Sequence, residues 1–286
     1  MNPPMKFRMG CEVYTWFMAG SGQVHANRLD HMIAVAAQSG FEGIEPIHGW
    51  MGDLADPGRL AESLARHRIA LPAVVLAQDW NGSTETQEER AAADDAIDLL
   101  TRFPGTLLCL VQRPTSRDDV VVRRQNLLGH LHRVALRARE RGVPCTFHPN
   151  SPHASITRTP EDYAVLLDGL DPTLVGWTPD VGHLINGGMD PLTMMRGHAE
   201  LINHVHFKDW DGAPEFALMG RGTVDFHGIT AWLRDRGYAG WIICEDEGPE
   251  ALSDPDGTTR HDGAWLRDTL LPALATESTR FTRSTG

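Results

Sequence analysis

The sequence predicts a single α/β domain built as a (β/α)8 barrel, the TIM-barrel fold. Eight short runs rich in apolar and β-branched residues recur along the 286 residues, and segments with helical periodicity lie between them. Strands that alternate with helices at this repeat length form parallel βαβ units, and eight such units close naturally into a barrel. An open doubly wound sheet is the alternative, but we find no glycine-rich dinucleotide fingerprint to support it.

The eight candidate strands are each bounded by turn residues. In chain order they are Phe7–Tyr14, Gly43–Ile47, Ala70–Ala77, Thr106–Val111, Val143–His148, Leu174–Asp180, His204–Lys208 and Gly240–Glu245. Helices are expected between them, because an Asp or Thr followed by Pro is typical of a helix start. Such starts occur at Asp56-Pro57, Thr159-Pro160 and Asp190-Pro191. A glycine where a helix would reverse is typical of a helix end. Such ends occur at Ser39-Gly40, Arg141-Gly142 and Arg236-Gly237.

We expect one barrel domain over residues 1–275 and a loosely ordered C-terminal tail over residues 276–286, which are polar and lack apolar periodicity. Two long loops are rich in Gly, Asn, Ser and Asp. They are Asp79–Glu89, after the third strand, and Asp211–Asp225, after the seventh. Both are candidates for lids over the mouth of the barrel.

Charge and cysteine usage restrict the class of partner and the compartment. The net charge is −12, with 26 basic residues scattered among 38 acidic ones, which argues against a nucleic-acid partner. The four cysteines, each within an apolar run, are typical of small core residues in a reduced compartment: Cys11, Cys109, Cys145 and Cys244. No apolar run approaches the length that spans a bilayer, and the first residues lack the apolar stretch of a signal peptide. We therefore expect a cytoplasmic protein that binds neither nucleic acid nor membrane.

Metal-ligand side chains follow four consecutive strands. His148, Asp180, His206 and Glu245 lie at the C-terminal ends of the fifth to eighth candidate strands, and a barrel delivers those ends to one mouth. Taken singly, a strand-end Glu is more often solvated and a strand His more often a hydrogen-bonded core residue. Together they predict one divalent metal ion. Two imidazoles and two carboxylates suit Mn²⁺, which we favour, or Co²⁺, Zn²⁺ or Fe²⁺, better than Ca²⁺ or Mg²⁺.

The seventh strand predicts a polar inner face. In a strand of period two, His204, His206 and Lys208 share one face, and Val205 and Phe207 face the helices. Three polar groups inside a barrel are costly unless they are paired, metal-bound or in a wet cavity. That cost indicates a functional site.

Further candidates lie around the same mouth. As acid or base we consider Glu45, His153, His183 and Lys208. Lys208 could equally be an ion-pair partner of Asp209 or of another carboxylate at the mouth, and His153 an ordinary loop residue. As substrate contacts we consider Trp16, Gln112, Asn150, Trp210 and Arg221. Tryptophans near strand ends commonly stack on sugar rings, although they also fill cores. We expect two of Trp16, Trp50, Trp80 and Trp210 to line the pocket.

At these residues the chain resembles the sugar phosphate isomerase/epimerase family, the xylose isomerase-like barrels that include ketose 3-epimerases, inosose dehydratase and endonuclease IV. The resemblance covers nearly the whole chain. Its most diagnostic stretches are Asp180–His183, His204–Asp209, Gly220–Phe226 and Glu245. The resemblance implies that Asp180, His206 and Glu245 are metal ligands, that His183 contacts substrate, and that Glu45 lies near the pocket.

One position departs from the epimerase pattern. Epimerases of the family carry a Glu at the end of the fifth strand, where this chain has His148 in Phe147-His148-Pro149-Asn150. That position looks more like the dehydratase branch. It calls into question the fourth ligand and the epimerases' proton transfer between two Glu residues.

These observations predict a metal-dependent lyase (dehydratase) or isomerase/epimerase that acts on a keto-sugar or keto-cyclitol through an enediolate, with elimination slightly favoured. One alternative is an endonuclease with three metal ions, but Glu45, Gln78 and Gln112 at the earlier strand ends supply too few ligands. Another is a non-catalytic sugar-binding barrel subunit. By analogy with similar barrels, a homo-oligomer is a further expectation.

Overall fold

The structure is a computed structural model that describes residues 6–18, 27–212 and 216–274. Within these ranges eight parallel strands form the barrel, and each corresponds to one predicted run. They are β1 Arg8–Glu12, β2 Gly43–Glu45, β3 Ala73–Gln78, β4 Leu107–Gln112, β5 Cys145–Phe147, β6 Val175–Trp177, β7 Val205–Phe207 and β10 Trp241–Cys244. The predicted tail, 276–286, lies outside the described residues.

The strands form two hydrogen-bonded arcs, ordered β2-β1-β10-β7 and β3-β4-β5-β6. Parallel bridges close the ring at both junctions. They are Gly43 with Ala70 and Ile47 with Val75 on one side, and Trp177 with Ile202 and Asp180 with His206 on the other. The last bridge matters for function because it places two predicted metal ligands side by side.

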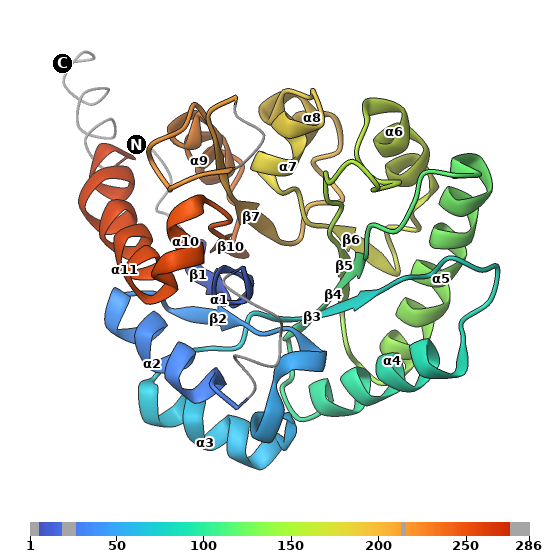
Figure 1. Cartoon of the computed structure of the whole chain (residues 1–286), viewed down its shortest axis with the longest axis horizontal. Helices are drawn as coiled ribbons and strands as arrows, with labels where there is room; N and C mark the ends of the chain where they lie inside the picture. The colour runs from blue at the N-terminus through green and yellow to red at the C-terminus, as the bar shows by residue number, and fades with distance from the viewer. Residues whose placement is uncertain (1–5, 19–26, 213–215, 275–286) are drawn as a thin grey trace.

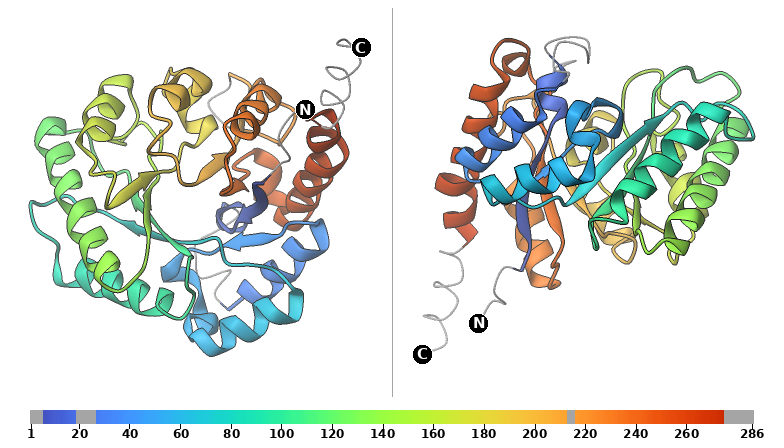
Figure 2. Two further views of the ribbon diagram at one scale, coloured as in Figure 1. Left: turned by 180° about the vertical axis from the view of Figure 1, so that it is seen from behind. Right: turned by 90° about the horizontal axis from the view of Figure 1, so that it is seen from below.

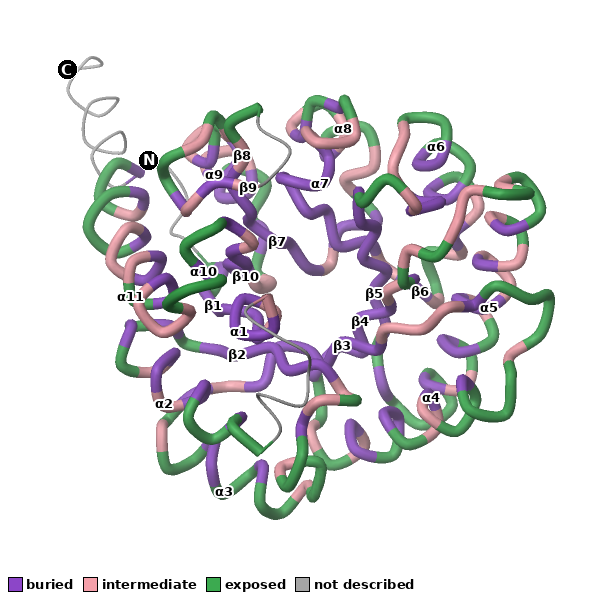
Figure 3. The backbone as a smooth tube through the Cα atoms, in the orientation of Figure 1, coloured by how far each residue is buried: buried purple, intermediate pink, exposed green. Residues whose placement is uncertain are grey.

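Helices surround the ring of strands on its outside, except that the short helix Tyr14–Phe17 lies at the centre of the ring in the view of Figure 1 (Figures 1 and 2). The longer ones are α2 Leu29–Ser39, α3 Pro57–His67, α4 Gln87–Leu100, α5 Val120–Glu140, α6 Pro160–Gly169, α9 Phe226–Asp235 and α11 Pro255–Trp265. The shorter ones are α1 Tyr14–Phe17, α7 Val181–Asn186, α8 Pro191–Gly197, α10 Pro249–Ser253, and the turns η1 His48–Trp50, η2 Gly52–Ala55 and η3 Leu266–Leu270. Buried residues follow the strands and the inward faces of these helices, and exposed residues follow the rim (Figure 3).

The predicted helix starts are confirmed by side-chain caps. Asp56 accepts a hydrogen bond from the Arg59 amide, and Asp190 accepts one from Thr193. Thr159 caps α6 by accepting from the Asp162 amide. The predicted helix end at Gly40 is also observed, since this residue has a φ of 93°. No described helix has the length and apolar character that would let it cross a membrane.

The two predicted lids behave differently. The loop that begins at Asp79 is anchored to the outer helix α5, where Arg123 donates to Asn81 and Arg137 pairs with Glu85. It therefore lies along the ring of helices and not across the mouth. The loop that begins at Asp211 does reach the site through a short antiparallel pair, β8 Asp209–Trp210 with β9 Phe216–Ala217. The Phe216 ring centroid lies 5.2 Å from that of His183 and 5.0 Å from Lys208 Nζ.

Candidate metal centre

The four predicted ligands converge at the C-terminal mouth of the barrel. His148 and Glu245 each follow the last residue of a strand, β5 and β10, and His206 is the middle residue of β7. Asp180 caps α7 by accepting from the His183 amide at 2.8 Å. One candidate ligand atom from each of the four lies within 4.8 Å of all the others, and all four residues are buried.

The polar atoms of this cluster fit a bound cation. Both ring nitrogens of His148, and Asp180 Oδ2, are buried without a hydrogen-bond partner among the described residues. His148 Nε2 lies 3.5 Å from Asp180 Oδ2. Buried polar atoms are nearly always satisfied, and atoms that are not often mark a missing ion or water. The mixed nitrogen and oxygen donor set is one that first-row transition ions accept.

A second group consists of Glu45, His204 and His206, and it shares His206 with the first group. Glu45 Oε2 lies 2.8 Å from His204 Nε2, and Glu45 Oε1 lies 3.3 Å from His206 Nε2. The other nitrogen of His206, Nδ1, lies 3.2 Å from Glu245 Oε2. Burial alone would raise the pKa of Glu45, but the charges and hydrogen bonds of His206 and His204 outweigh it and lower that pKa. Glu45 therefore occupies one nitrogen of His206 and directs the other toward Glu245 and the metal cluster.

Lys208 lies fully buried among the carboxylates of the mouth. Its Nζ lies 3.2 Å from Asp180 Oδ2, 3.2 Å from Glu245 Oε1 and in contact with Glu247. Burial opposes the charge, but these carboxylates hold the pKa of Lys208 well above its ordinary value. The close approach of α7 depends on Gly182, where a Cβ would lie 2.7 Å from the Lys208 carbonyl oxygen. The alternative expectation of an ion pair with a mouth carboxylate is therefore confirmed for Lys208. Asp209 is not one of its partners, because Asp209 accepts from the amides of Trp210, Gly220 and Gly222.

His183 is held in one protonation state by its neighbours. Burial and Lys208 lower its pKa to about 3, so the ring is neutral at pH 7. Lys208 Nζ lies 3.0 Å from Nε2 and can only donate, so Nε2 is the acceptor and Nδ1 carries the proton. Nδ1 lies 2.8 Å from Ser151 Oγ, which can accept this proton in a hydrogen bond.

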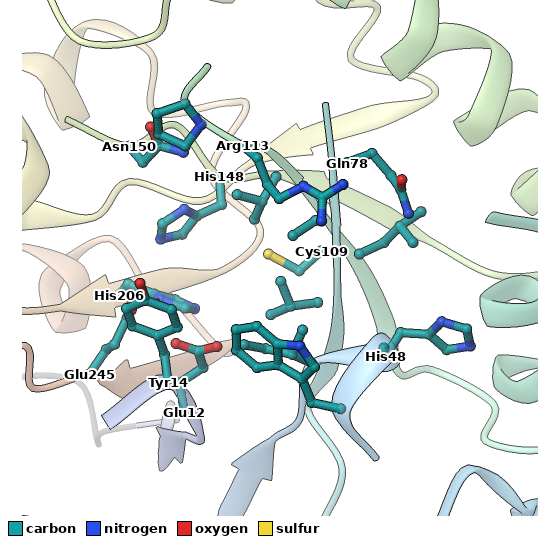
Figure 4. A pocket seen from close by; sticks show the side chains of 18 of the residues that line it. Glu12, Tyr14, His48, Gln78, Cys109, Arg113, His148, Asn150, His206 and Glu245 are labelled. Atoms are coloured by element: carbon teal, nitrogen blue, oxygen red, sulfur yellow. The ribbon is translucent and has the colours of Figure 1, made fainter. Parts of the chain in front are cut away.

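A cavity of about 540 Å³ opens beside the metal cluster. Three of the four predicted ligands line it: His148, His206 and Glu245. Figure 4 shows Glu245, His206, Glu12 and Tyr14 gathered at one end, with His148 above them. His183 and Asn150 also line the cavity, as expected for substrate contacts. Asn150 Oδ1 is buried and has no hydrogen-bond partner among the described residues, so it is available to a ligand.

Comparison with known proteins gives a family. A family model described as the xylose isomerase-like TIM barrel matches residues 33–269. The chain belongs to this family. Inosose dehydratase of Geobacillus kaustophilus is 25% identical over 292 aligned positions, which cover 89% of this chain and 91% of that protein. The family model confirms the expected family and fold, and the match to inosose dehydratase confirms the expectation of an enzyme.

Two solved structures share the fold. D-Psicose 3-epimerase of Clostridium cellulolyticum H10, solved with D-tagatose, superposes with a TM-score of 0.73 at 16% identity and covers 92% of this chain and 98% of its own. The IOLI protein, solved with a bound zinc atom, superposes with a TM-score of 0.70 at 15% identity, again covering 92% and 98%.

Several predicted residues do not line the cavity. They are Glu45, Lys208, His153, Trp16, Gln112, Trp210 and Arg221. Trp16 is completely buried and donates from Nε1 to Asp256 at 2.7 Å, so it belongs to the core next to α11. His153 and Arg221 are exposed on loops. Gln112 donates to the backbone carbonyl of Asp79 at 3.0 Å, and is used to hold a loop. Of the four tryptophans only Trp50 lines the cavity, where two were expected.

Two acidic residues at the site were not predicted. Glu12 ends β1, and its register with Glu45 on β2 turns its side chain into the barrel. Burial and the nearby Glu245 carboxylate raise its pKa well above the ordinary value. Glu247 contacts Lys208, and burial raises its pKa to about 8. A signal was available in both cases, since each is a charged residue at the C-terminal end of a predicted strand.

Proposed function

We propose that the protein is a divalent-metal-dependent lyase of the dehydratase type that acts on a keto-sugar or keto-cyclitol through an enediolate. The observation that carries this proposal is the convergence of His148, Asp180, His206 and Glu245 beside the cavity, with candidate ligand atoms within 4.8 Å of one another. The resemblance to inosose dehydratase over most of both chains supports it. The structurally similar IOLI protein was solved with a bound zinc atom, which agrees with a metal-dependent function.

The four ligands would hold the ion, with Glu45 as the residue that positions His206. A divalent ion held by these residues would supply Lewis acidity, which would make the C–H next to a substrate carbonyl more acidic. We assign the metal as Mn²⁺ first, with Co²⁺, Zn²⁺ and Fe²⁺ as alternatives, from the donor set alone.

Proton transfer is assigned to Lys208 and Glu247, and orientation of the ammonium to His183. Lys208 Nζ is hydrogen-bonded to His183 and Glu247, and it lies 3.2 Å from Asp180 Oδ2 and 3.2 Å from Glu245 Oε1. If Asp180 and Glu245 are committed to the cation, the ammonium stays paired with Glu247 and His183. Both of these residues line the cavity. Both ring nitrogens of His183 are engaged, so His183 orients the ammonium and Glu247 is the residue that can pass a proton between Lys208 and a group in the cavity.

Elimination is favoured over reprotonation on carbon because of the side chain that follows β5. An imidazole there, His148, replaces the carboxylate that the epimerases of the family would place beside the substrate. The alternative within the same chemistry is an epimerase or isomerase, in which the proton returns to carbon. The alternative of another class is a sugar-binding barrel without catalysis.

Incubation in deuterated water separates these functions. The metal-loaded protein is mixed with a keto-inositol or a 3-keto-hexose and the products are followed by NMR. A dehydratase gives an unsaturated product, and an epimerase gives deuterium on carbon without loss of water. Chelation should abolish either reaction, and Asp180→Asn should do the same. Binding of the sugar with neither outcome, in the presence of metal, would refute catalysis of this type.

A further inference from the structure

The cavity beside the metal cluster has two chemically different ends. The end formed by the loops after β5, β6 and β10 and by the end of β1 carries the charged and imidazole side chains already described. The opposite end is formed by β3, β4 and the segment after β2. It is lined by aliphatic side chains, among them Ile47, Val75, Ala77 and Val111, and also by the polar side chains of His48, Gln78 and Arg113. In Figure 4 Cys109 lies between the two groups, with His48 and Gln78 at the far rim.

Between these polar side chains, the aliphatic wall itself does not suit a sugar hydroxyl. A hydroxyl buried against a wall without hydrogen-bond partners loses its water and gains nothing, at a cost of roughly 1–3 kcal/mol. The volume of about 540 Å³ also lies in the range of pockets that enclose a drug-sized ligand, which is much larger than one sugar ring. A free keto-sugar held at the metal end would leave the aliphatic end in contact with water.

An aromatic platform adjoins this end. Trp50 lies on η1, is partly exposed and lines the cavity. Phe17 stacks on it with ring centroids 4.0 Å apart, and Tyr14 lies 6.2 Å away at an interplanar angle of 18°. A tryptophan fixed in this way offers a flat apolar face for stacking.

We propose that the natural substrate is a hydroxy-ketone ring that carries a flat, apolar substituent. The ring occupies the metal end, and the substituent lies against Trp50 and the aliphatic wall. The position of the ring rests on the proposed function. The position of the substituent rests on the shape and lining of the cavity.

A matched pair of ligands tests the inference by binding alone. The probes are the methyl and the phenyl glycoside of one 3-keto-hexose, titrated calorimetrically into the metal-loaded protein. Burial of the phenyl ring should tighten binding by about tenfold or more relative to the methyl compound. Trp50→Ala and Ala77→Phe should each remove most of that gain, the first by loss of stacking and the second by filling the aliphatic end. Both should leave the affinity for the methyl glycoside within about twofold.

The matched control is Trp232→Ala, which removes a tryptophan that packs under Arg236 on α9 and does not line the cavity. It should leave the phenyl preference intact. Equal affinity for the two glycosides in the unmodified protein would overturn the inference, as would a phenyl preference that survives Ala77→Phe. If the phenyl preference holds but neither glycoside is turned over, the catalytic proposal fails and the substituent site stands. If both glycosides are turned over equally well with no preference in binding, the substituent site fails and the catalytic proposal stands.

Discussion

The substitution Glu45→Gln tests how the metal cluster is held in place. Glu45 contacts His204 at 2.8 Å and His206 at 3.3 Å, and it is completely buried. Glutamine has the same shape but only one oxygen, so one of the two imidazole N–H groups must face an amide N–H. His206 then loses the partner that fixes its tautomer, or His204 becomes unpaired in its place.

Loss of such a carboxylate behind a metal-binding histidine typically weakens metal binding by 10- to 100-fold. We expect about tenfold for Glu45→Gln, which keeps one acceptor, or about 1.4 kcal/mol. Glu45→Leu keeps the approximate volume but removes both acceptors, and its loss should approach 100-fold. The loss of metal affinity is expected to be larger for Glu45→Leu because Glu45 contacts two histidines, and leucine removes both contacts where glutamine removes one.

The assay is the dissociation constant for Mn²⁺ and Zn²⁺, measured by competition with a chromogenic chelator, with circular dichroism to confirm folding. Glu42→Gln is the matched control, because Glu42 makes its ion pair with Arg8 at the surface and lies three residues before Glu45. It should leave metal affinity unchanged. If Glu45→Gln binds metal like the wild type but loses at least 100-fold in kcat, Glu45 is a catalytic base and the positioning role is wrong.

Three further outcomes follow from the buried charges. Lys208→Met should lower the free energy of unfolding of the metal-free protein by about 3–5 kcal/mol, because it leaves carboxylates without their counter-charge. Added Mn²⁺ should restore most of this loss. Lys6→Met, at the exposed other lysine, is the control and should change the free energy of unfolding neither without nor with Mn²⁺ in the same denaturation series. Burial and Asp246 hold the pKa of Asp262 well above its ordinary value, so the folded state keeps a proton that the unfolded chain releases, and its contribution to stability falls as pH rises above about 4. Asp262→Asn should therefore match the wild type in urea denaturation below about pH 4 and exceed it increasingly above that pH; a constant difference at all pH values would contradict this. Removal of metal with a chelator should lower the melting temperature, since an ion at 100 times its dissociation constant adds about 2.7 kcal/mol, and Asp180→Asn should lose this response.

The strands and the convergence of the four proposed ligands could be predicted because they depend on local rules. Parallel strands end at one mouth, so residues that follow β5, β6 and β10 meet whatever the details of packing. The shared inward face of His204, His206 and Lys208 follows from the period of two, and all three are buried at the site. The helix starts at Asp56 and Thr159 follow from capping chemistry in the same way.

The finer roles could not be predicted because they depend on register and on contacts between distant segments. Nothing near Glu45 in the sequence shows that its partners are His204 and His206, which come from the strand next but two around the ring. Trp16 follows a strand end as Trp50 does, but the bond to Asp256, 240 residues later, turns it into the core. The direction in which the Asp79 loop folds is set by arginines of α5. A single sequence contains no signal for these contacts.

We propose that one divalent ion is held by His148, Asp180, His206 and Glu245. Crystals grown with Mn²⁺ and measured for anomalous scattering test this site. We expect one strong peak per chain, about 2.0–2.3 Å from a nitrogen or oxygen of each of the four residues. No peak at this mouth, or a peak held by Glu45 and His204 instead, would contradict it.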